Sequence, residues 1–376
     1  MEEIRINEGG AETPISSAPA PEGRGLKKPV PKWIWITTLV VLFLAVAALA
    51  YWVIKGNFFA NPIEVAKRTS PSPSKDLNDT PCPLDGVMTT KERAERRPLG
   101  IMVENAPEAR PQSGLDKASF IFETPSEGGI TRFLVFYVEN DANEVGPVRS
   151  ARTYFIDWAD EVRAIYAHAG GSAIALENLS NDKYLCDINH DQDHFWRDNS
   201  RFAPHNLYTT TDKIRAAANA AKCSQKADYK GYQFKEDAKK EERGTTQAIT
   251  VNFSSAIFQV VYNYDPEKNV YLRSLAGKPH NDKVTGTQLA PKSLVVMHAD
   301  RVTSPSDGLQ QSHAVTTGTG AAEIYMDGKK IAGTWKRASI SDRTTFYDEA
   351  GKEVVFDRGQ IWVNVLPPTG TTTSTP

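Results

Sequence analysis

The sequence lacks several features that would place it in a functional class at once. Three cysteines among 376 residues cannot build a disulfide-dense scaffold. Lys and Arg number 44 against 46 Asp and Glu, so the net charge of −2 provides no global positive field for nucleic acid. No G-x-S-x-G, P-loop, H-E-x-x-H or G-x-G-x-x-G motif occurs. We therefore expect no cofactor, no metal and no nucleic-acid partner, and no motif assigns a catalytic residue.

One long apolar run is present near the N-terminus. Residues 33–54 (WIWITTLVVLFLAVAALAYWVI) are 22 residues without a charge, and a helix of that length spans a hydrocarbon core of about 30 Å. The basic residues that directly precede the run are Arg24, Lys27, Lys28 and Lys32. Because Lys55 alone follows closely, the positive-inside bias predicts a single-pass signal-anchor, with residues 1–32 as a disordered cytosolic tail and the large C-terminal part outside the cell membrane. A cleaved signal peptide is the rival interpretation, but its apolar region is usually about 7–15 residues long.

The chain beyond the apolar run divides into linkers and two patterned parts. Proline and turn residues predict an extracytoplasmic tether over 55–96. Alternating strand and helix patterns predict an α/β (α+β) domain with a mixed sheet over 97–236. A charged hinge at 237–248 separates it from a β-rich domain at 249–367, and residues 368–376 are expected to be a disordered tail.

Local patterns predict individual elements within these two parts. The run FLVFYV within 130–139 suits a strand buried on both faces. Ser150 is expected to cap a helix that runs to about Val162, and Ser172 a second, shorter helix. Asp327-Gly328 fits the type I′ turn of a two-residue hairpin.

The strongest polar cluster is GPVRSAR, residues 146–152. Arg149 and Arg152 stand at the expected start of a helix, where cations are disfavoured by the helix dipole. An anionic ligand would explain them, because guanidinium groups and free N–H groups both donate to carboxylate or phosphate. Internal salt bridges are the alternative explanation, with Glu104, Glu123 or Glu127 as partners.

Neighbouring loops add further candidates for the same site. Glu127 and Arg132 flank the two glycines of EGGITR, which allow close approach of a ligand or another backbone, and RPQSGL adds an arginine and a glutamine. The predicted ligand-binding residues, in an Arg/Gly-rich groove of the first domain, are Arg110, Gln112, Glu127, Arg132, Arg149, Arg152, His205 and Asn206.

Histidines and cysteines leave alternatives open. His205 or His168 could serve as a general base beside Asp157 or Glu127 in an envelope hydrolase or transferase. The i,i+4 pair of histidines in NHDQDHFW has a zinc-like spacing, but its surroundings favour a solvated loop. Two of the cysteines, in LCDIN and KCSQK, could pair in an oxidising compartment, and the sequence does not decide it.

The same segments resemble the YerB-like family of bacterial exported proteins, a two-part domain of unknown function. The matching stretches are RPLGIMVEN, ARPQSGL, ETPSEGGITRFLVFY, VGPVRSAR, FWRDNSRFAPHNLYT, YMDGKKIAGTWKR and GQIWVNVLP. The resemblance implies a membrane-attached envelope protein with an α/β first part and a β-rich second part, and it implies no catalytic residue. Many relatives look like lipoproteins, whereas here an apolar helix is expected in place of the lipid.

Two hypotheses of function follow, with a third behind them. The leading one is a non-catalytic envelope module that binds an anionic or polar ligand, such as a cell-wall glycan or peptide, because the arginine-rich loops lack a nucleophile–base arrangement. The enzyme with a histidine base is the alternative, and a structural partner of a membrane complex is the third. A histidine within hydrogen-bond reach of a carboxylate in an open cleft would favour chemistry, and arginines around an empty pocket would favour binding.

Overall fold

The computed structural model describes residues 32–58, 78–304 and 311–376. These residues belong to two compact units, Met1–Ser72 and Pro73–Pro376. Residues 1–31 of the tail predicted at 1–32, and most of the first half of the predicted tether, lie outside the described residues.

The first unit contains the helix α1 (Lys32–Phe58). Its described apolar side chains, such as Leu39 and Phe43, are exposed. Among the residues whose side chains are described, no helix is long and apolar enough to cross a membrane. The membrane-spanning segment predicted at 33–54 is therefore not supported by the structure.

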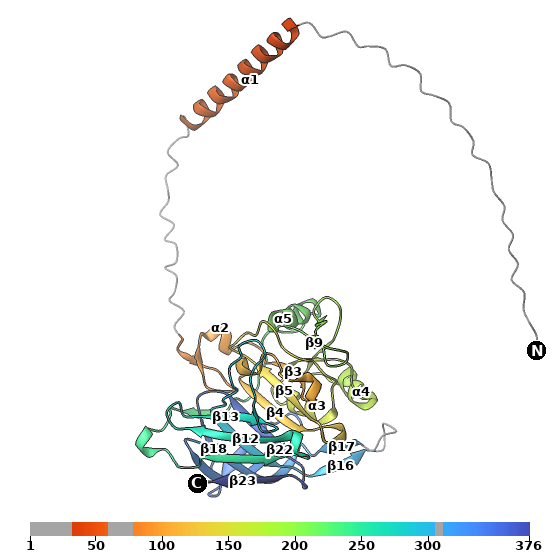
Figure 1. Cartoon of the computed structure of the whole chain (residues 1–376), viewed down its shortest axis with the longest axis vertical. Coiled ribbons are helices and arrows are strands. Elements are labelled where there is room, and N and C mark those ends of the chain that lie inside the picture. Colours follow the sequence, from red (N-terminus) through yellow and green to blue (C-terminus); the bar gives the residue numbers. More distant parts are fainter. Residues whose placement is uncertain (1–31, 59–77, 305–310) are drawn as a thin grey trace, which may run out of the picture. The chain divides into compact units, whose positions relative to one another are not determined.

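The second unit is built on one mixed sheet of ten strands (Figure 1). In spatial order these strands are β20 (Thr345–Asp348), β19 (Lys329–Arg337), β18 (Gly318–Met326), β15 (Ser293–His298), β22 (Ile361–Leu366), β4 (Phe120–Pro125), β5 (Thr131–Tyr137), β3 (Leu99–Glu104), β6 (Ile165–His168) and β7 (Cys186–Asn189). Four of the pairings are parallel, β15–β22, β22–β4, β3–β6 and β6–β7, and the others are antiparallel. The expected mixed sheet is confirmed.

The two predicted parts of the chain meet inside this sheet. β22, from the second part, lies parallel to β4, from the first part, with Ile361 opposite Phe120 and Asn364 opposite Glu123. A sheet that runs through both parts makes them one compact unit. The β-rich character expected for the second part is confirmed, but its largest sheet also contains strands of the first part.

The central strands are buried on both faces, as the continuous apolar run in β5 predicts. Phe133 and Val135 join the core on one face, and Leu134 and Phe136 join the core on the other. This alternation follows from the two-residue period of a strand. Every residue of β5 is buried.

A second, antiparallel sheet of five strands supplies apolar side chains to one of these cores. Its strands in spatial order are β14 (Lys278–Pro279), β13 (Val270–Leu275), β12 (Gln259–Asp265), β11 (Ala248–Asn252) and β23 (Thr371–Thr375). Val251 and Tyr262 pack in the same core as Phe133 and Trp362 of the large sheet. The disordered tail predicted at 368–376 is wrong, because β23 pairs with β11 from Thr371 to Thr375.

Short helices pack around the sheets of the second unit. They are α2 (Lys91–Ala94), α3 (Thr153–Asp160), α4 (Ala173–Asn181) and α5 (Thr211–Ala220). Short 3₁₀ turns are η1 (Pro107–Ala109), η2 (Leu115–Lys117), η3 (Glu127–Gly129), η4 (Lys240–Glu242) and η5 (Ala256–Phe258). Trp158 of α3 stacks on Phe122 of the large sheet, with ring centroids 4.7 Å apart.

The helix starts follow the predicted caps in one case and not in the other. Ser172 caps α4, since its hydroxyl accepts from the N–H of Ala175. The cap predicted at Ser150 is wrong, because α3 begins after Arg152, whose carbonyl accepts from Phe155 and Ile156. Arg152 thus stands at the very start of a helix, as the sequence indicated, but does not cap it with its side chain.

Four two-stranded pairs complete the second unit. They are β1 (Thr80–Pro81) with β2 (Met88–Thr89), β8 (Trp196–Arg197) with β9 (Leu207–Tyr208), β10 (Gln233–Lys235) with β21 (Val355–Asp357), and β16 (Arg301–Ser304) with β17 (Gln311–Ala314). The cysteine pairing left open by the sequence is settled in the structure, because Cys186 and Cys223 form a disulfide that joins β7 to the segment after α5.

Two segments predicted as linkers are folded. From residue 78 onward the expected tether forms β1, β2 and α2, and Cys82 and Leu84 are buried in the core. Its turn residues make a tight hairpin rather than a flexible spacer. The expected hinge at 237–248 is also held in place, because the Arg243 side chain donates to the Ala238 carbonyl at 3.0 Å and the Gly244 N–H donates to the Asp327 carbonyl at 2.8 Å.

The hairpin predicted at Asp327-Gly328 is confirmed. Met326 pairs with Lys329 across the turn, and both turn residues have positive φ, 53° and 65°. These are the dihedrals of a type I′ turn. A Cβ at Gly328 would lie 2.5 Å from Tyr264 and 2.6 Å from the Gly244 carbonyl.

We expect Gly328→Val to lower the free energy of unfolding by more than about 1–2 kcal/mol, because a left-handed β-branched residue is strained and its Cβ also meets backbone. Thermal melting measures the loss. Gly277→Val is the matched control, since Gly277 has φ of 74° but open space around it, and it reports the strain without the contact. Equal melting temperatures for Gly328→Val and the parent chain would contradict this description of the turn.

Candidate functional site

Three loops of the first part converge beside the end of β3. The loop of residues 105–113, the loop of residues 145–152 and the loop of residues 198–206 are tied together by hydrogen bonds between backbone atoms and from Arg201. Ser113 N–H donates to the Gly146 carbonyl at 2.9 Å, and Arg201 donates to the Ala109 carbonyl at 2.7 Å. Each loop contains one cis peptide bond, before Pro111, Pro147 and Pro204 respectively. Loops that the sequence separates by up to about a hundred residues thus share one location.

The carboxylate of Glu104 is the centre of this convergence. It lies at the end of β3, nearly fully buried, and one oxygen lies 3.1 Å from Nε of Arg149. The other oxygen lies 2.9 Å from Nδ1 of His205, and since a carboxylate only accepts, Nδ1–H is the donor. Glu104 therefore orients both side chains, which are each about a quarter exposed, 28% for Arg149 and 23% for His205.

Arg149 and His205 keep unused hydrogen-bonding atoms. Within the described chain, neither terminal nitrogen of Arg149 has a hydrogen bond, and its Nε faces Glu104 without an aligned one. Nε2 of His205 likewise has no protein partner among the described residues, since its only bond runs through Nδ1. Side chains that contact a ligand are expected to be held by the protein at one atom and to have other hydrogen-bonding atoms unpaired.

Arg152 and Arg132 are committed to the protein instead. Both pair with Glu127, Arg132 at 3.2 Å, and Arg132 also donates to the Ser150 carbonyl at 2.9 Å. Burial would raise the pKa of Glu127, but the two guanidinium groups outweigh it and hold the pKa at about 2. The internal salt bridge is therefore the correct explanation for Arg152, Arg132 and Glu127, which brace the start of α3.

Arg110 and Gln112 do not join Arg149, so the single concave site expected from the sequence is wrong. Arg110 donates to the backbone carbonyl of Asn105 at 2.9 Å, and its guanidinium lies 5.0 Å from the ring of Phe258. Gln112 is buried and contacts His280 at 2.8 Å. Both side chains face the five-stranded sheet of the second part.

Asn206 and His168 are structural. Asn206 donates to the carbonyls of Asp198 and Arg201 at 3.2 and 3.1 Å and accepts from Arg197, which closes the loop of residues 198–206. His168 is fully buried, and its two ring nitrogens lie 2.7 Å from the Gly170 carbonyl and from Asp187. Both nitrogens of this buried ring are engaged by groups of the protein, so His168 presents neither nitrogen to a substrate.

The other sequence candidates for chemistry also separate. Asp157, on α3, accepts a hydrogen bond from Thr316 at 2.6 Å, and Glu127 is held by arginines, so the described contacts pair neither carboxylate with His168 or His205. His190 and His194 follow β7 in a turn rather than on a helix, and His194 bonds to Asp191 at 2.8 Å. The zinc-like spacing does not bring the two imidazoles onto one helical face.

Sequence reasoning missed a buried ion pair that joins the two parts. Arg273 on β13 donates to Glu123 on β4 at 2.6 Å, and both side chains are fully buried. Trp362 also donates to Glu123, at 3.1 Å, and its ring lies 4.4 Å from the Arg273 guanidinium. A signal was present in the sequence, because in VYLRSL the arginine occupies an inward position of an alternating strand.

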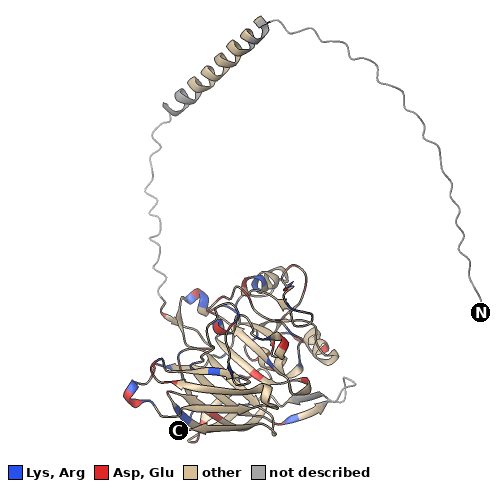
Figure 2. Ribbon diagram, in the orientation of Figure 1, with Lys and Arg blue, Asp and Glu red and all other residues tan. Residues whose placement is uncertain are grey.

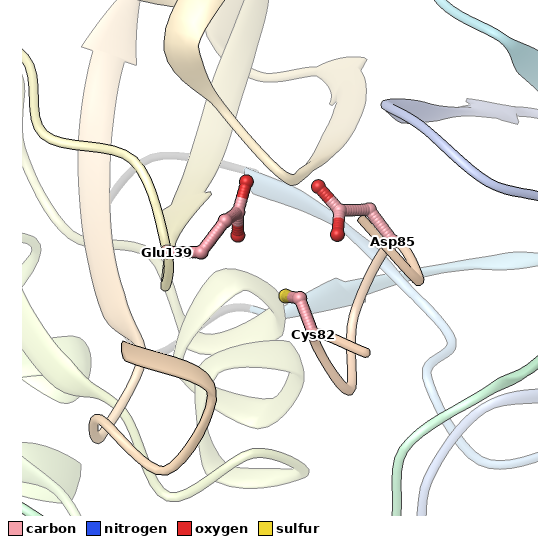
Figure 3. Close-up of side chains that lie close together, drawn as sticks. All are labelled: Cys82, Asp85 and Glu139. Atoms are coloured by element: carbon pink, nitrogen blue, oxygen red, sulfur yellow. The ribbon is translucent and has the colours of Figure 1, made fainter. Parts of the chain in front are cut away.

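A second buried polar cluster lies where the N-terminal hairpin meets the large sheet (Figure 3). Cys82, Asp85 and Glu139 place one ligand-type atom each within 4.8 Å of one another. Burial, reinforced by the neighbouring carboxylates, raises the pKa of the Cys82 thiol and of Asp85 well above their usual values. The cluster links residues 82–85 to Glu139, which follows β5.

Charge over the second unit is mixed. Figure 2 shows basic and acidic residues interspersed along its ribbon.

Comparisons with known proteins agree with this architecture. Residues 84–224 match the N-terminal domain of DUF3048, a protein family of unknown function, and residues 249–363 match its C-terminal domain. The chain is 32% identical over 313 residues to "Putative lipoprotein YerB" of Bacillus subtilis (strain 168), which covers 80% of this chain and 89% of that protein. The crystal structure of the Bacillus subtilis YerB protein superposes with a TM-score of 0.70 at 29% identity, over 78% of this chain and 99% of that one. The resemblance to the YerB-like proteins is confirmed, and the chain belongs to the two-part DUF3048 family.

Proposed function

We propose that this chain is a membrane-attached envelope protein whose folded unit lies outside the cytoplasm and binds an anionic ligand through its first part. The name of the YerB relative supports membrane attachment, and the disulfide between Cys186 and Cys223 supports an oxidising compartment. The uncharged run of residues 33–54, with its basic N-terminal flank, supports attachment by a single-pass helix with a cytosolic N-terminus.

The observation that carries the ligand-binding proposal is the state of Arg149 and His205. Both are fixed by one buried carboxylate, and both keep unpaired nitrogens at a partly exposed position. A fixed guanidinium with two unused terminal nitrogens is suited to bidentate contact with a carboxylate or phosphate. The ion pair with Glu104 restricts the side chain, so binding costs less entropy than it would for an unpaired arginine.

The charge of the surroundings favours an anion. Arg132, Arg149 and Arg152 face the two carboxylates Glu104 and Glu127, so the arginines of the cluster outnumber its carboxylates by one. Anionic cell-wall fragments are the ligand class that fits an envelope location. A carboxylate or phosphate group on such a fragment would neutralise the excess positive charge of the arginines.

An enzymatic function is the second candidate, and the Glu104–His205 contact favours it. A carboxylate on Nδ1 leaves Nε2 as the basic nitrogen, which is the orientation used by histidine bases. The role of structural partner in a membrane complex is the remaining alternative. Failure of every tested wall fragment to bind would favour it.

We expect Arg149→Gln to weaken binding of anionic cell-wall fragments by about 1–3 kcal/mol, the usual scale for a charged hydrogen bond, with little change in melting temperature. Isothermal titration calorimetry and thermal melting on the same samples measure both. Arg358→Gln is the matched control, because the Arg358 side chain is 27% exposed and pairs with the exposed Glu236, yet lies on another part of the surface. A large fall in melting temperature for Arg149→Gln alone would make this arginine structural and end the proposal.

His205→Gln separates binding from catalysis. The parent chain is expected to leave wall fragments intact, and the variant to bind them a few-fold more weakly because one polar contact is altered. Mass spectrometry of the fragments after long incubation is the measurement. Cleavage by the parent chain that disappears in His205→Gln would establish the enzyme instead.

Protease added to intact cells tests the location. We expect the folded unit to be digested, while an epitope tag at the N-terminus stays protected by the membrane. The control is the same treatment after permeabilisation, which should remove the tag as well. Full protection of the folded unit in intact cells would refute the proposed topology.

A further inference from the structure

A cavity lies on the seam between the two parts of the protein. Its volume is about 560 Å³, and it is bounded by the loop that carries Arg110 and by the β13–β14 hairpin with the residues that follow. Three prolines, Leu275 and Ala276 form an apolar wall. The polar groups in the wall are Arg110, Lys278, His280 and Asn281.

Two cations in this wall have unused donors. Arg110 is fixed by its bonds to Asn105 through Nε and one terminal nitrogen, while the other terminal nitrogen has no partner in the described chain. Burial lowers the pKa of Arg110 to about 10, so it remains charged at neutral pH. Lys278 is exposed and has no ion pair with any residue described. Together they offer a site for one anionic group.

His280 offers the opposite function, a buried acceptor. The amide nitrogen of Gln112 donates to the Glu104 carbonyl and to Asn105, so its oxygen faces His280 and accepts from Nε2–H. Burial, with Arg273 and Arg110 nearby, lowers the pKa of His280 well below its usual value, so the ring is neutral. Nδ1 then carries a lone pair, is buried, and has no donor among the described residues.

An unsatisfied buried acceptor is costly, and in native structures it usually has a reason. Here the acceptor belongs to a side chain that lines a cavity with two cations and an apolar wall. A ligand that suits all three features carries an anion, a hydrogen-bond donor close to it, and a small apolar group.

We propose that this seam cavity binds the free carboxyl end of a peptide. The terminal carboxylate meets Arg110 and Lys278, the amide N–H of the last residue donates to Nδ1 of His280, and a small apolar side chain packs on the prolines. Carboxylate and amide N–H are attached to the same Cα in a peptide terminus, so one residue supplies both. The inference does not depend on Arg149 and is separate from the function proposed above.

The test measures binding of the probe N-acetyl-Ala-Ala to the full-length chain in detergent by isothermal titration calorimetry. We expect binding of the free acid, at least tenfold weaker binding of its C-terminal amide, and weaker binding of inorganic phosphate. Probes built from L-alanine and from D-alanine distinguish a protein terminus from a wall peptide as the source, and preference for either supports the cavity. Equal affinity for acid and amide, or tighter binding of phosphate, would overturn the proposal.

Variants locate the binding. Lys278→Gln should weaken binding of the free acid about three- to tenfold without affecting folding, because Lys278 is exposed and has no ion pair among the described residues. Lys352→Gln, at another exposed position, should leave the affinity for the free acid unchanged. His280→Phe keeps a ring in the wall but removes the acceptor, and should reduce the preference for N-acetylated probes over acetate. An unaffected Lys278→Gln would place the peptide elsewhere.

Discussion

The parallel pairing of β22 with β4 is the contact on which the folded unit depends. It joins strands about 240 residues apart in the chain and makes one sheet from two sequence parts. Glu123 of β4 is held at this join by Arg273 and Trp362, all buried. Removing one partner of such a pair leaves a buried charge, which typically costs about 3–5 kcal/mol. The halves therefore cannot move independently without exposing that charge.

Both candidate binding regions follow from the join. The loop of residues 105–113 lies between the two regions. On one side, Glu104 contacts Arg149 and His205. On the other side, Asn105 contacts Arg110, and Gln112 contacts His280. Consecutive residues of an extended chain point to opposite sides, so one short segment serves two surfaces. The seam cavity exists only because the five-stranded sheet of the second part is fixed against this loop.

Local patterns in the sequence predicted local structure and little beyond it. FLVFYV, Ser172 and Asp327-Gly328 each act through neighbours a few residues away, and each appears in the structure as predicted. The shared sheet was not predictable, because the apolar pattern of β22 does not say which strand it will join. β23 reads TTTST, without apolar alternation, and its pairing rests on backbone hydrogen bonds that any polar sequence can make. At the candidate site the arginines were identified, but which of them pair with Glu127 depends on loops whose approach no local rule predicts.

The position of β22 in the chain order affects how this protein is made. Residues 361–366 insert between β15 and β4, so both neighbours keep an open edge until almost the whole polypeptide is available. A nascent chain cannot complete its central sheet until β22 emerges late in synthesis. The same order makes any premature stop before residue 361 harmful, because two long apolar edges would then be presented for aggregation.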